Sequence, residues 1–300
     1  MASGNLALGI FFLSQTVLGL LGNSALLCCF IIADLTGIRA KPTDLIVKHL
    51  TWANITVLLV KGIPQTIAAF GQTYFLGDVS CKLVFYFHRV ARGVSLGSTC
   101  LLSVIQAITI SPSNSIWAQV KVRAPRIIGP SLGLCWALYL LVNSFIVMTV
   151  TDMRDKGNLT EFRQFVYCLV VKLSKQSYIV HLVLLTFSDV ICLGLMMWAS
   201  SSMVLILLRH KQRVQHIRRF TSSGASPETK ATQSILTLVS SFVVLYGTSV
   251  ILILYFPFQD GTDAWLGNAG VAMSACFPAL SPFLLIRYYT RDFTLYVTSK

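Results

Sequence analysis

Charged residues are scarce in this chain. Asp, Glu, Lys and Arg make up 12% of its 300 residues, about half of the ~25% that is typical of soluble domains. Hydrophobic residues make up 55%, and the mean hydropathy is +0.71. The length alone would suit about two soluble domains, but so few charges cannot cover the surface of water-soluble globules. The composition therefore excludes an ordinary soluble protein.

Acidic residues are scarcer than basic ones. The chain has 11 Asp and Glu against 24 Lys and Arg, which gives a formal net charge of +13. Nucleic-acid binders share such an excess but are basic and polar, whereas this chain is basic and hydrophobic. The five histidines are scattered, and no glycine-rich phosphate loop occurs. We therefore expect an integral membrane protein with no cofactor, no metal site and no nucleic-acid partner.

Long hydrophobic runs, in contrast, are plentiful. A transmembrane helix needs ~20 apolar residues to cross a hydrocarbon core of ~30 Å. Seven stretches qualify and predict spans at residues 6–33, 44–70, 83–110, 127–150, 179–208, 232–256 and 264–286. The first run is about twice as long as a signal-peptide core and no Lys or Arg precedes it, so we interpret it as a retained helix. The prediction is an all-α membrane protein, a seven-transmembrane helix bundle that forms one domain over residues 1–300.

The loops between these spans differ in charge. The first, third and fifth loops and the tail carry fourteen Lys and Arg against three acids, whereas the opposite face carries six of each. Lys and Arg near span ends are retained on the cytoplasmic side. This asymmetry predicts an extracellular N-terminus and a cytoplasmic C-terminus. It also assigns most of the +13 to topology, and only a small share of it lies within the spans.

Two chemical features agree with this orientation. Cys81, just before the third span, and Cys168, in the second outer loop, both face the oxidising compartment, where a disulfide can persist. The other six cysteines fall inside spans. The glycosylation sequon that begins at Asn158 lies in the same outer loop, whereas the one at Asn54 lies inside a span and cannot meet the glycosylation machinery.

Seven spans with this topology and an outer Cys–Cys link resemble a G-protein-coupled receptor. Gly22-Asn23 in the first span and Trp136 in the fourth fit the rhodopsin class. Other marks of that class differ: residues 105–107 have the sequence IQA where Asp-Arg-Tyr is usual, the sixth span lacks Cys-Trp-x-Pro, and residues 281–283 have SPF where Asn-Pro-x-x-Tyr is usual. The second span has no acidic residue in its middle, so a rhodopsin-type sodium site is not expected.

A closer resemblance accounts for these departures. The chain resembles the vomeronasal type 1 receptor family in the strings TDLIVKHL (43–50), KGIPQT (61–66), HRVxRGVS (88–95), CLLSVxQA (100–107), RHKQRVQHI (209–217) and FPxxSPF (277–283). The match runs from about residue 44 to residue 282. The resemblance implies a receptor for pheromones or small odorants in the plasma membrane, coupled to a heterotrimeric G protein of the inhibitory class. It does not identify the ligand.

Ionisable residues inside the spans form a candidate ligand site. Each central Arg, Lys or Asp costs ~2.5–3.5 kcal/mol on insertion scales and needs a partner or an aqueous cavity. Arg89 and Arg92 lie three apart on one helical face, and His88 lies beside them. Lys61, before Gly62-Ile63-Pro64 where we expect a helix break, and Asp189 of the fifth span should lie at a similar depth. Such a basic pocket would favour acidic or polar-headed ligands; alternatively, Asp189 pairs with Arg89 or Arg92 and only ties two spans together.

The cytoplasmic face would engage the G protein. Gln106 stands where the rhodopsin class has its arginine, and Arg209, Lys211 and Arg213 follow the fifth span. These basic residues could contact a G protein, or they could only enforce topology and bind anionic lipid heads. Ser226-Pro227-Glu228 has the pattern of a helix start, so the sixth helix should begin in the cytoplasm.

Two other classes of protein share isolated features. Gly93-x-Ser95-x-Gly97 matches the G-x-S-x-G pattern of hydrolases, but that pattern requires a strand-to-helix turn and here it lies within an apolar helix. The two glycines more simply let helices approach closely, so we expect no enzyme. A transporter could use the charged residues within the spans as a substrate path, with a broken helix at Gly62-Ile63-Pro64. Transporters usually show internal repeats, and none is found here.

Overall fold

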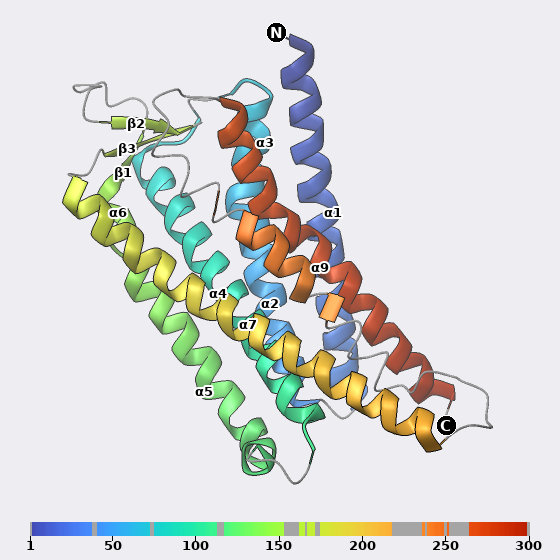
Figure 1. The fold of residues 1–300 in the computed structure, drawn as a ribbon. Coiled ribbons are helices and arrows are strands. Elements are labelled where there is room, and N and C mark those ends of the chain that lie inside the picture. Colours follow the sequence, from blue (N-terminus) through green and yellow to red (C-terminus); the bar gives the residue numbers. More distant parts are fainter. Residues whose placement is uncertain are drawn as a thin grey trace.

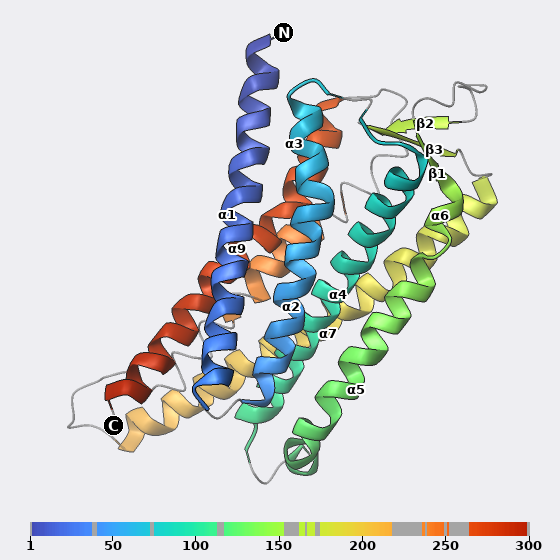
Figure 2. The same ribbon diagram turned by 180° about the vertical axis from the view of Figure 1, so that it is seen from behind.

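The structure is a computed structural model. It describes residues 2–37, 41–72, 75–112, 117–152, 162–165, 167–171, 175–217, 236–237, 239–248, 251 and 264–298. Long helices run side by side from one end of the molecule to the other, and a small β-sheet caps one end (Figures 1 and 2). The N-terminus lies at the end with the sheet and the C-terminus at the opposite end.

The helices follow the order of the hydrophobic runs. They are α1 (Ala2–Leu35), α2 (Pro42–Val57), the π-helical turn η1 (Leu58–Gly62), α3 (Ile63–Ala69), α4 (Asp78–Ile110), α5 (Ala118–Asn143), α6 (Ile146–Thr149), α7 (Lys175–Ile217) and α9 (Ala264–Thr298). A shorter apolar helix, Val239–Thr248, lies between α7 and α9 in the sequence. It falls within the predicted sixth span, and the rest of that span lies outside the described residues.

The predicted fold class is confirmed. Within the described ranges, six helices are long and apolar enough to cross a membrane, and Val239–Thr248 adds a shorter apolar helix. The predicted ends were less accurate, because α4 starts five residues earlier than expected and α7 and α9 continue well past residues 208 and 286. Hydropathy marks the part of a helix that crosses hydrocarbon, whereas helical backbone bonds can continue into the polar region beyond it.

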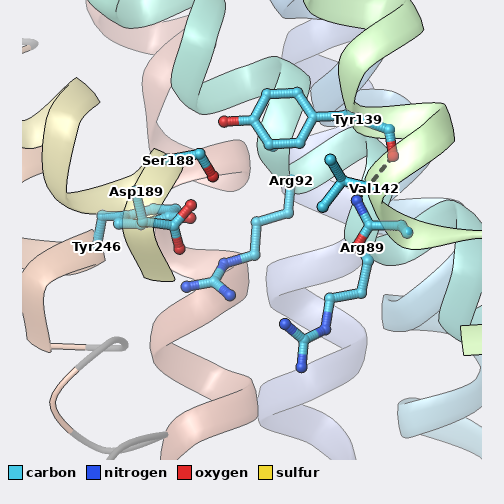
Figure 3. Close-up of a pocket in the computed structure, with 9 residues that line it drawn as sticks. Arg89, Arg92, Tyr139, Val142, Ser188, Asp189 and Tyr246 are labelled. Carbon is cyan, nitrogen blue, oxygen red and sulfur yellow. Dashed lines mark hydrogen bonds between the residues drawn. The ribbon is translucent and has the colours of Figure 1, made fainter. Parts of the chain in front are cut away.

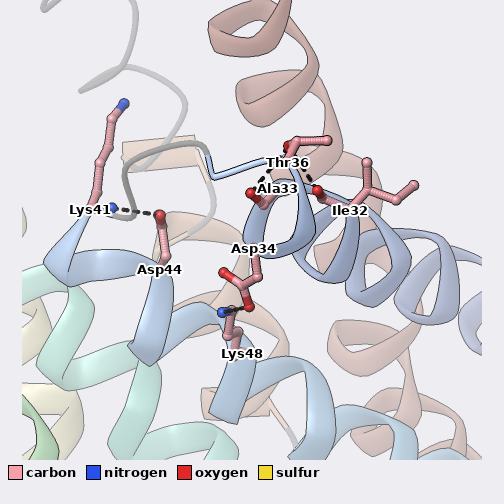
Figure 4. A network of polar contacts seen from close by, with 7 residues as sticks. All are labelled: Ile32, Ala33, Asp34, Thr36, Lys41, Asp44 and Lys48. Atoms are coloured by element: carbon pink, nitrogen blue, oxygen red, sulfur yellow. Dashed lines mark hydrogen bonds and ion pairs between the residues drawn. The ribbon is translucent and has the colours of Figure 1, made fainter.

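Polar contacts lie at the end of α1 and the start of α2, opposite the sheet (Figure 4). The Asp44 carboxylate accepts a 2.7 Å hydrogen bond from the backbone N–H of Lys41, which satisfies one of the free donors at the start of α2. Pro42 occupies the first helical position, where a missing N–H is harmless. Lys48 of α2 forms a 2.6 Å ion pair with Asp34 of α1, so the two helices are joined at this end.

The second span is not broken at Gly62-Ile63-Pro64, so that expectation was wrong. The turn Leu58–Gly62 widens into a π-helix, and α3 continues directly from it. Proline lacks a backbone N–H and its ring clashes with the carbonyl four residues earlier. The wider turn accommodates Pro64 without interrupting the span. Gly62 is required here, because a Cβ at this position would lie 2.5 Å from the Thr16 hydroxyl oxygen of α1.

The sheet at the N-terminal end is tied to the bundle by a disulfide. Strands β1 (Val150–Thr151), β2 (Phe162–Phe165) and β3 (Cys168–Val171) pair antiparallel in the order β1-β3-β2. Cys168 of β3 is bonded to Cys81 of α4, with the two Cα atoms 6.0 Å apart. The predicted disulfide is therefore present. The other six cysteines are free and lie on helices, as expected.

The helices pack through one large hydrophobic core. Every long helix contributes to it: Leu26, Leu50, Leu96, Ile128, Met196, Phe242 and Phe277 are representative members. At Gly93 and Gly97 of α4, an added Cβ would collide with Tyr139 and Cys135 of α5. The prediction that these two glycines allow close helix approach is confirmed. We call the end with the disulfide and the sheet the disulfide end.

Candidate ligand site

One face of α4 carries the predicted basic residues toward the interior near the disulfide end. His88 and Arg89 lie three and four residues after Phe85, and Arg92 lies four and three residues after them, so the four residues share one side of the helix. Arg92 is only 9% exposed, and a charge at this depth requires polar surroundings. The sequence prediction of a basic cluster on this helix face is therefore consistent with where α4 places these residues.

A small cavity lies beside Arg92 (Figure 3). It has a volume of about 20 Å³, which is room for one or two water molecules. Four helices line it, with Arg89 and Arg92 from α4, Tyr139 from α5, Ser188 and Asp189 from α7, and Tyr246 from the helix Val239–Thr248. Polar groups from four helices thus converge on one point, as they do in ligand sites.

Tyr246 contacts both the arginine and the acid. The guanidinium carbon of Arg92 is 4.4 Å from the centre of the Tyr246 ring, within the range of a cation–π contact. The Tyr246 hydroxyl donates a hydrogen bond to the Asp189 carboxylate, and Asp189 also attracts Arg92 at longer range. Within the described residues no ion pair of 4.0 Å or less joins Arg92 to Asp189, and the Nη2 atom of Arg92 is buried without a hydrogen-bond partner. The predicted tie between spans is therefore indirect.

Lys61 and His88 lie apart from this cavity. The Lys61 ammonium sits 4.8 Å from the centre of the Phe85 ring and 5.2 Å from that of Tyr167. His88 interacts electrostatically with Lys61, Arg89 and Arg92, and its buried Nε2 atom has no hydrogen-bond partner among the described residues. Neither residue lines the cavity. The sequence predicts one basic cluster, whereas the structure has two neighbouring groups along the same face of α4. Arg89, Arg92 and Asp189 line the cavity, and Lys61 and His88 lie next to it.

Sequence reasoning missed three tyrosines of this region. Tyr139 and Tyr246 line the cavity, and Tyr167 covers Lys61. A tyrosine in an apolar span is a usable signal, because its hydroxyl needs a partner when buried. Tyr246 could have been found this way. Tyr167 could not, because its place depends on the sheet and the disulfide, which bring residues far apart in the sequence together.

The predicted G-protein-facing residues lie toward the end opposite the sheet. Gln106 is half-buried near the end of α4, and Arg209 is exposed near the end of α7. Lys211 and Arg213 belong to α7, but their side chains lie outside the described part of the structure. The predicted glycosylation site Asn158 and the predicted helix start at Ser226-Pro227-Glu228 also lie outside the described residues.

A buried polar network occupies the middle of the bundle. Ser95 of α4 donates a 2.8 Å hydrogen bond to the Asn54 side-chain oxygen of α2, and Asn54 donates a 2.9 Å bond to the Ser281 hydroxyl of α9. Ser95 thus lies inside a continuous helix and is used in a structural bond. The strand-to-helix turn that exposes a hydrolase serine is not found around it.

Comparisons with known proteins agree on one family. A family model described as the vomeronasal organ pheromone receptor family matches residues 6–295. The chain is 50% identical over 287 residues to vomeronasal type-1 receptor 4 of Homo sapiens, which covers 95% of each protein. It is 46% identical over 293 residues to vomeronasal type-1 receptor 3 of Homo sapiens, covering 97% of the chain and 94% of the relative. A more distant relative, olfactory receptor class A-like protein 1 of Danio rerio, is 32% identical over 280 residues, covering 93% and 88%.

Proposed function

The chain belongs to the vomeronasal organ pheromone receptor family, whose members include the vomeronasal type-1 receptors, and on this basis we propose that it binds a small pheromone-like or odorant ligand and activates a heterotrimeric G protein of the inhibitory class. It is a multi-pass protein of the plasma membrane. The ligand would bind in the outer half of the bundle, near the disulfide end. The family is one of receptors, and we propose no enzymatic activity for this chain.

The convergence of four helices on the Arg92 cavity is the observation that carries this placement. Arg92, Tyr139, Asp189 and Tyr246 reach the cavity from different helices. A cavity of about 20 Å³ is far smaller than the ~300–1,000 Å³ of typical ligand pockets. An odorant must therefore separate these helices when it binds. Because α4, α5 and α7 continue to the opposite end, their movement would link ligand binding to the surface offered to a G protein.

The loop charges favour one orientation of the bundle in the membrane. We propose that the disulfide end is extracellular and that the opposite end, with Gln106, Arg209, Lys211 and Arg213, faces the G protein. The basic bias of the first, third and fifth loops supports this. The position of Cys81–Cys168 supports it as well, because disulfides persist in oxidising compartments.

A transporter is not favoured. Every relative reported above carries a receptor name. The helix break that a transporter path would use is absent, since η1 joins α2 and α3 without interruption. No feature of the described residues favours substrate flux over ligand binding.

The test is expression of the receptor in cells with two G-protein reporters. One reporter follows cyclic AMP through the inhibitory class, and the other uses a promiscuous G protein. We expect a small odorant from a panel of neutral and anionic volatiles to lower cyclic AMP and to activate the promiscuous reporter. Activation of the promiscuous reporter alone would contradict the inhibitory class. No response above vector with either reporter, at confirmed surface display, would overturn the proposed function.

A further inference from the structure

Lys61 has surroundings that none of the features described so far explains. It lies in the π-helical turn η1, where an extra residue per turn re-aims the side chain, and such turns are frequent at functional sites. Its ammonium faces the rings of Phe85 from α4 and Tyr167 from the segment before β3, at 4.8 and 5.2 Å. No ion pair of Lys61 occurs among the described residues. The aromatic faces solvate the charge only in part.

Two further polar groups next to Lys61 have no partner among the described residues. The hydroxyl of Tyr167 is buried without a hydrogen-bond partner, and the whole residue is only 2% exposed. The Nε2 atom of His88, one turn below Phe85 on α4, is also buried and unpartnered. Each buried group left without a hydrogen bond costs ~1–3 kcal/mol. Burial raises the pKa of Tyr167, so its hydroxyl keeps its proton and is available as a donor.

Among the described residues, the charged groups that act on Lys61 and on its neighbour His88 are all positive. Arg89 acts on Lys61 as a like charge, and His88 is close enough to both arginines and to Lys61 to feel all three. Among the described residues, the only acid that lines the neighbouring cavity is Asp189, which accepts a hydrogen bond from Tyr246. An anion placed beside Lys61 would therefore be attracted by Lys61, Arg89 and Arg92. It would also meet the unpartnered polar groups of Tyr167 and His88.

We propose that Lys61, Phe85, His88 and Tyr167, the Lys61 pocket, bind the carboxylate of an amphipathic anion. Lys61 would pair with the carboxylate, the Tyr167 hydroxyl would donate to it, and the two rings would contact the first carbons of its hydrocarbon chain. The inference rests on the proposed function, since this anion would be the acidic head of the receptor's ligand, whose remainder would extend toward the Arg92 cavity. The same chemistry fits the headgroup of an anionic lipid, and the experiment separates the two sources.

The experiment measures binding without a G protein, so its outcome is independent of signalling. The purified receptor in phosphatidylcholine nanodiscs is titrated with decanoate or with decan-1-ol, which share a chain and differ in charge, and the thermal unfolding midpoint is followed. The variants are Lys61→Met, which keeps the length and removes the charge, and Tyr167→Phe, which removes only the hydroxyl. Lys82→Met is the matched control. Lys82 lies about one turn before Phe85 on α4, and its ammonium already pairs with Asp78 at 2.7 Å.

The wild type should be half-saturated by decanoate at a concentration at least about tenfold below that for decan-1-ol. Lys61→Met should abolish this difference, Tyr167→Phe should reduce it about threefold, and Lys82→Met should retain it. If the anion comes from the membrane, phosphatidylserine nanodiscs will raise the unfolding midpoint of the wild type and not that of Lys61→Met. Decanoate will then raise the midpoint of the wild type little further. This result assigns the pocket to a lipid headgroup carboxylate.

Three results would overturn the proposal. The first is that decanoate and decan-1-ol change the unfolding midpoint of the wild type equally, or that neither changes it. The second is a decanoate preference that survives in Lys61→Met. The third is a probe-free Lys61→Met receptor that melts several degrees below Lys82→Met, because Lys61 would then have a structural role. A failure of the reporter assay would leave these binding results unchanged and would count only against the proposed function.

Discussion

At the scale of single residues, Arg92 is a buried charge that the surrounding protein compensates poorly. It is 9% exposed, it contacts the Tyr246 ring at 4.4 Å, and its Nη2 atom lacks a hydrogen-bond partner among the described residues. A guanidinium held mainly by one ring in a low-dielectric interior is poorly compensated. The same guanidinium is available to a polar ligand that enters the cavity.

We expect Arg92→Met to weaken the response to an acidic agonist by at least about tenfold and to leave surface expression unchanged. A charge-assisted hydrogen bond contributes ~1.5–3 kcal/mol, which corresponds to a factor of ten or more in affinity. The measurement is a concentration–response curve in the reporter cells, with surface display quantified by an N-terminal epitope. Arg126→Met is the control, because Arg126 is exposed on the part of α5 far from the cavity. Loss of surface display in Arg92→Met would favour the structural role instead.

The polar network of Asn54 gives a second prediction at this scale. Asn54, Ser95 and Ser281 are all at most 3% exposed, and Asn54 makes both of the hydrogen bonds that join the other two. Asn54→Ala would leave two buried hydroxyls short of a partner at a cost of ~1–3 kcal/mol each. We expect the thermal unfolding midpoint of the purified receptor to fall by several degrees. Thr56→Ala, whose hydroxyl bonds only the Trp52 carbonyl of its own helix, should change it little; equal effects of the two variants would contradict the role of the network.

At the scale of helices, the contact of α4 with α5 depends on missing side chains. A Cβ at Gly93 would collide with the ring of Tyr139, whereas one at Gly133 of α5 would meet nothing within 4 Å. Gly93→Ala should therefore force α4 and α5 apart and lower both the unfolding midpoint and the surface level. Gly133→Ala should be neutral or slightly stabilising, because alanine favours helix. The comparison is made by fluorescence-detected thermal unfolding, and a Gly93→Ala receptor as stable as Gly133→Ala would show that the helices can repack without cost.

Helices were also the scale at which the sequence was most informative. Seven apolar runs were enough to predict the spans, because hydrocarbon thickness sets their length. The π-turn of η1 was not predicted, since Gly62-Ile63-Pro64 fits a break as well as a widened turn. The neighbours of each charge were not predicted either. The contact of Lys61 with Tyr167, and those of Tyr246 with Arg92 and Asp189, depend on how distant segments pack. The periodicity of one helix carries no information about its partners.

At the scale of the whole molecule, the distribution of charge along the sequence predicts the orientation. The excess of +13 comes mainly from the first, third and fifth loops and the tail, and by the positive-inside rule we propose that the N-terminus and the disulfide lie outside. Positive charge within the bundle is costly for folding, and we propose that the Arg92 cavity and the Lys61 pocket use it to bind acidic ligands. The basic residues of the loops would thus set the topology, and the basic residues inside the bundle would bind the ligand.

Glycosylation tests this orientation directly. Of the two sequons considered, Asn158 falls between β1 and β2 in the sequence, whereas Asn54 is 1% exposed near the end of α2 and bonded to Ser281. If the disulfide end is extracellular, only Asn158 can meet the glycosylation machinery. We expect treatment of the wild-type receptor with peptide N-glycosidase to shift its gel band by one glycan, and Asn158→Gln to run at the shifted position without treatment. Cells that are not permeabilised should also stain for an N-terminal epitope and not for a C-terminal one. A C-terminal epitope accessible from outside would reverse the orientation and place the Lys61 pocket and the Arg92 cavity on the cytoplasmic side, out of reach of an external odorant.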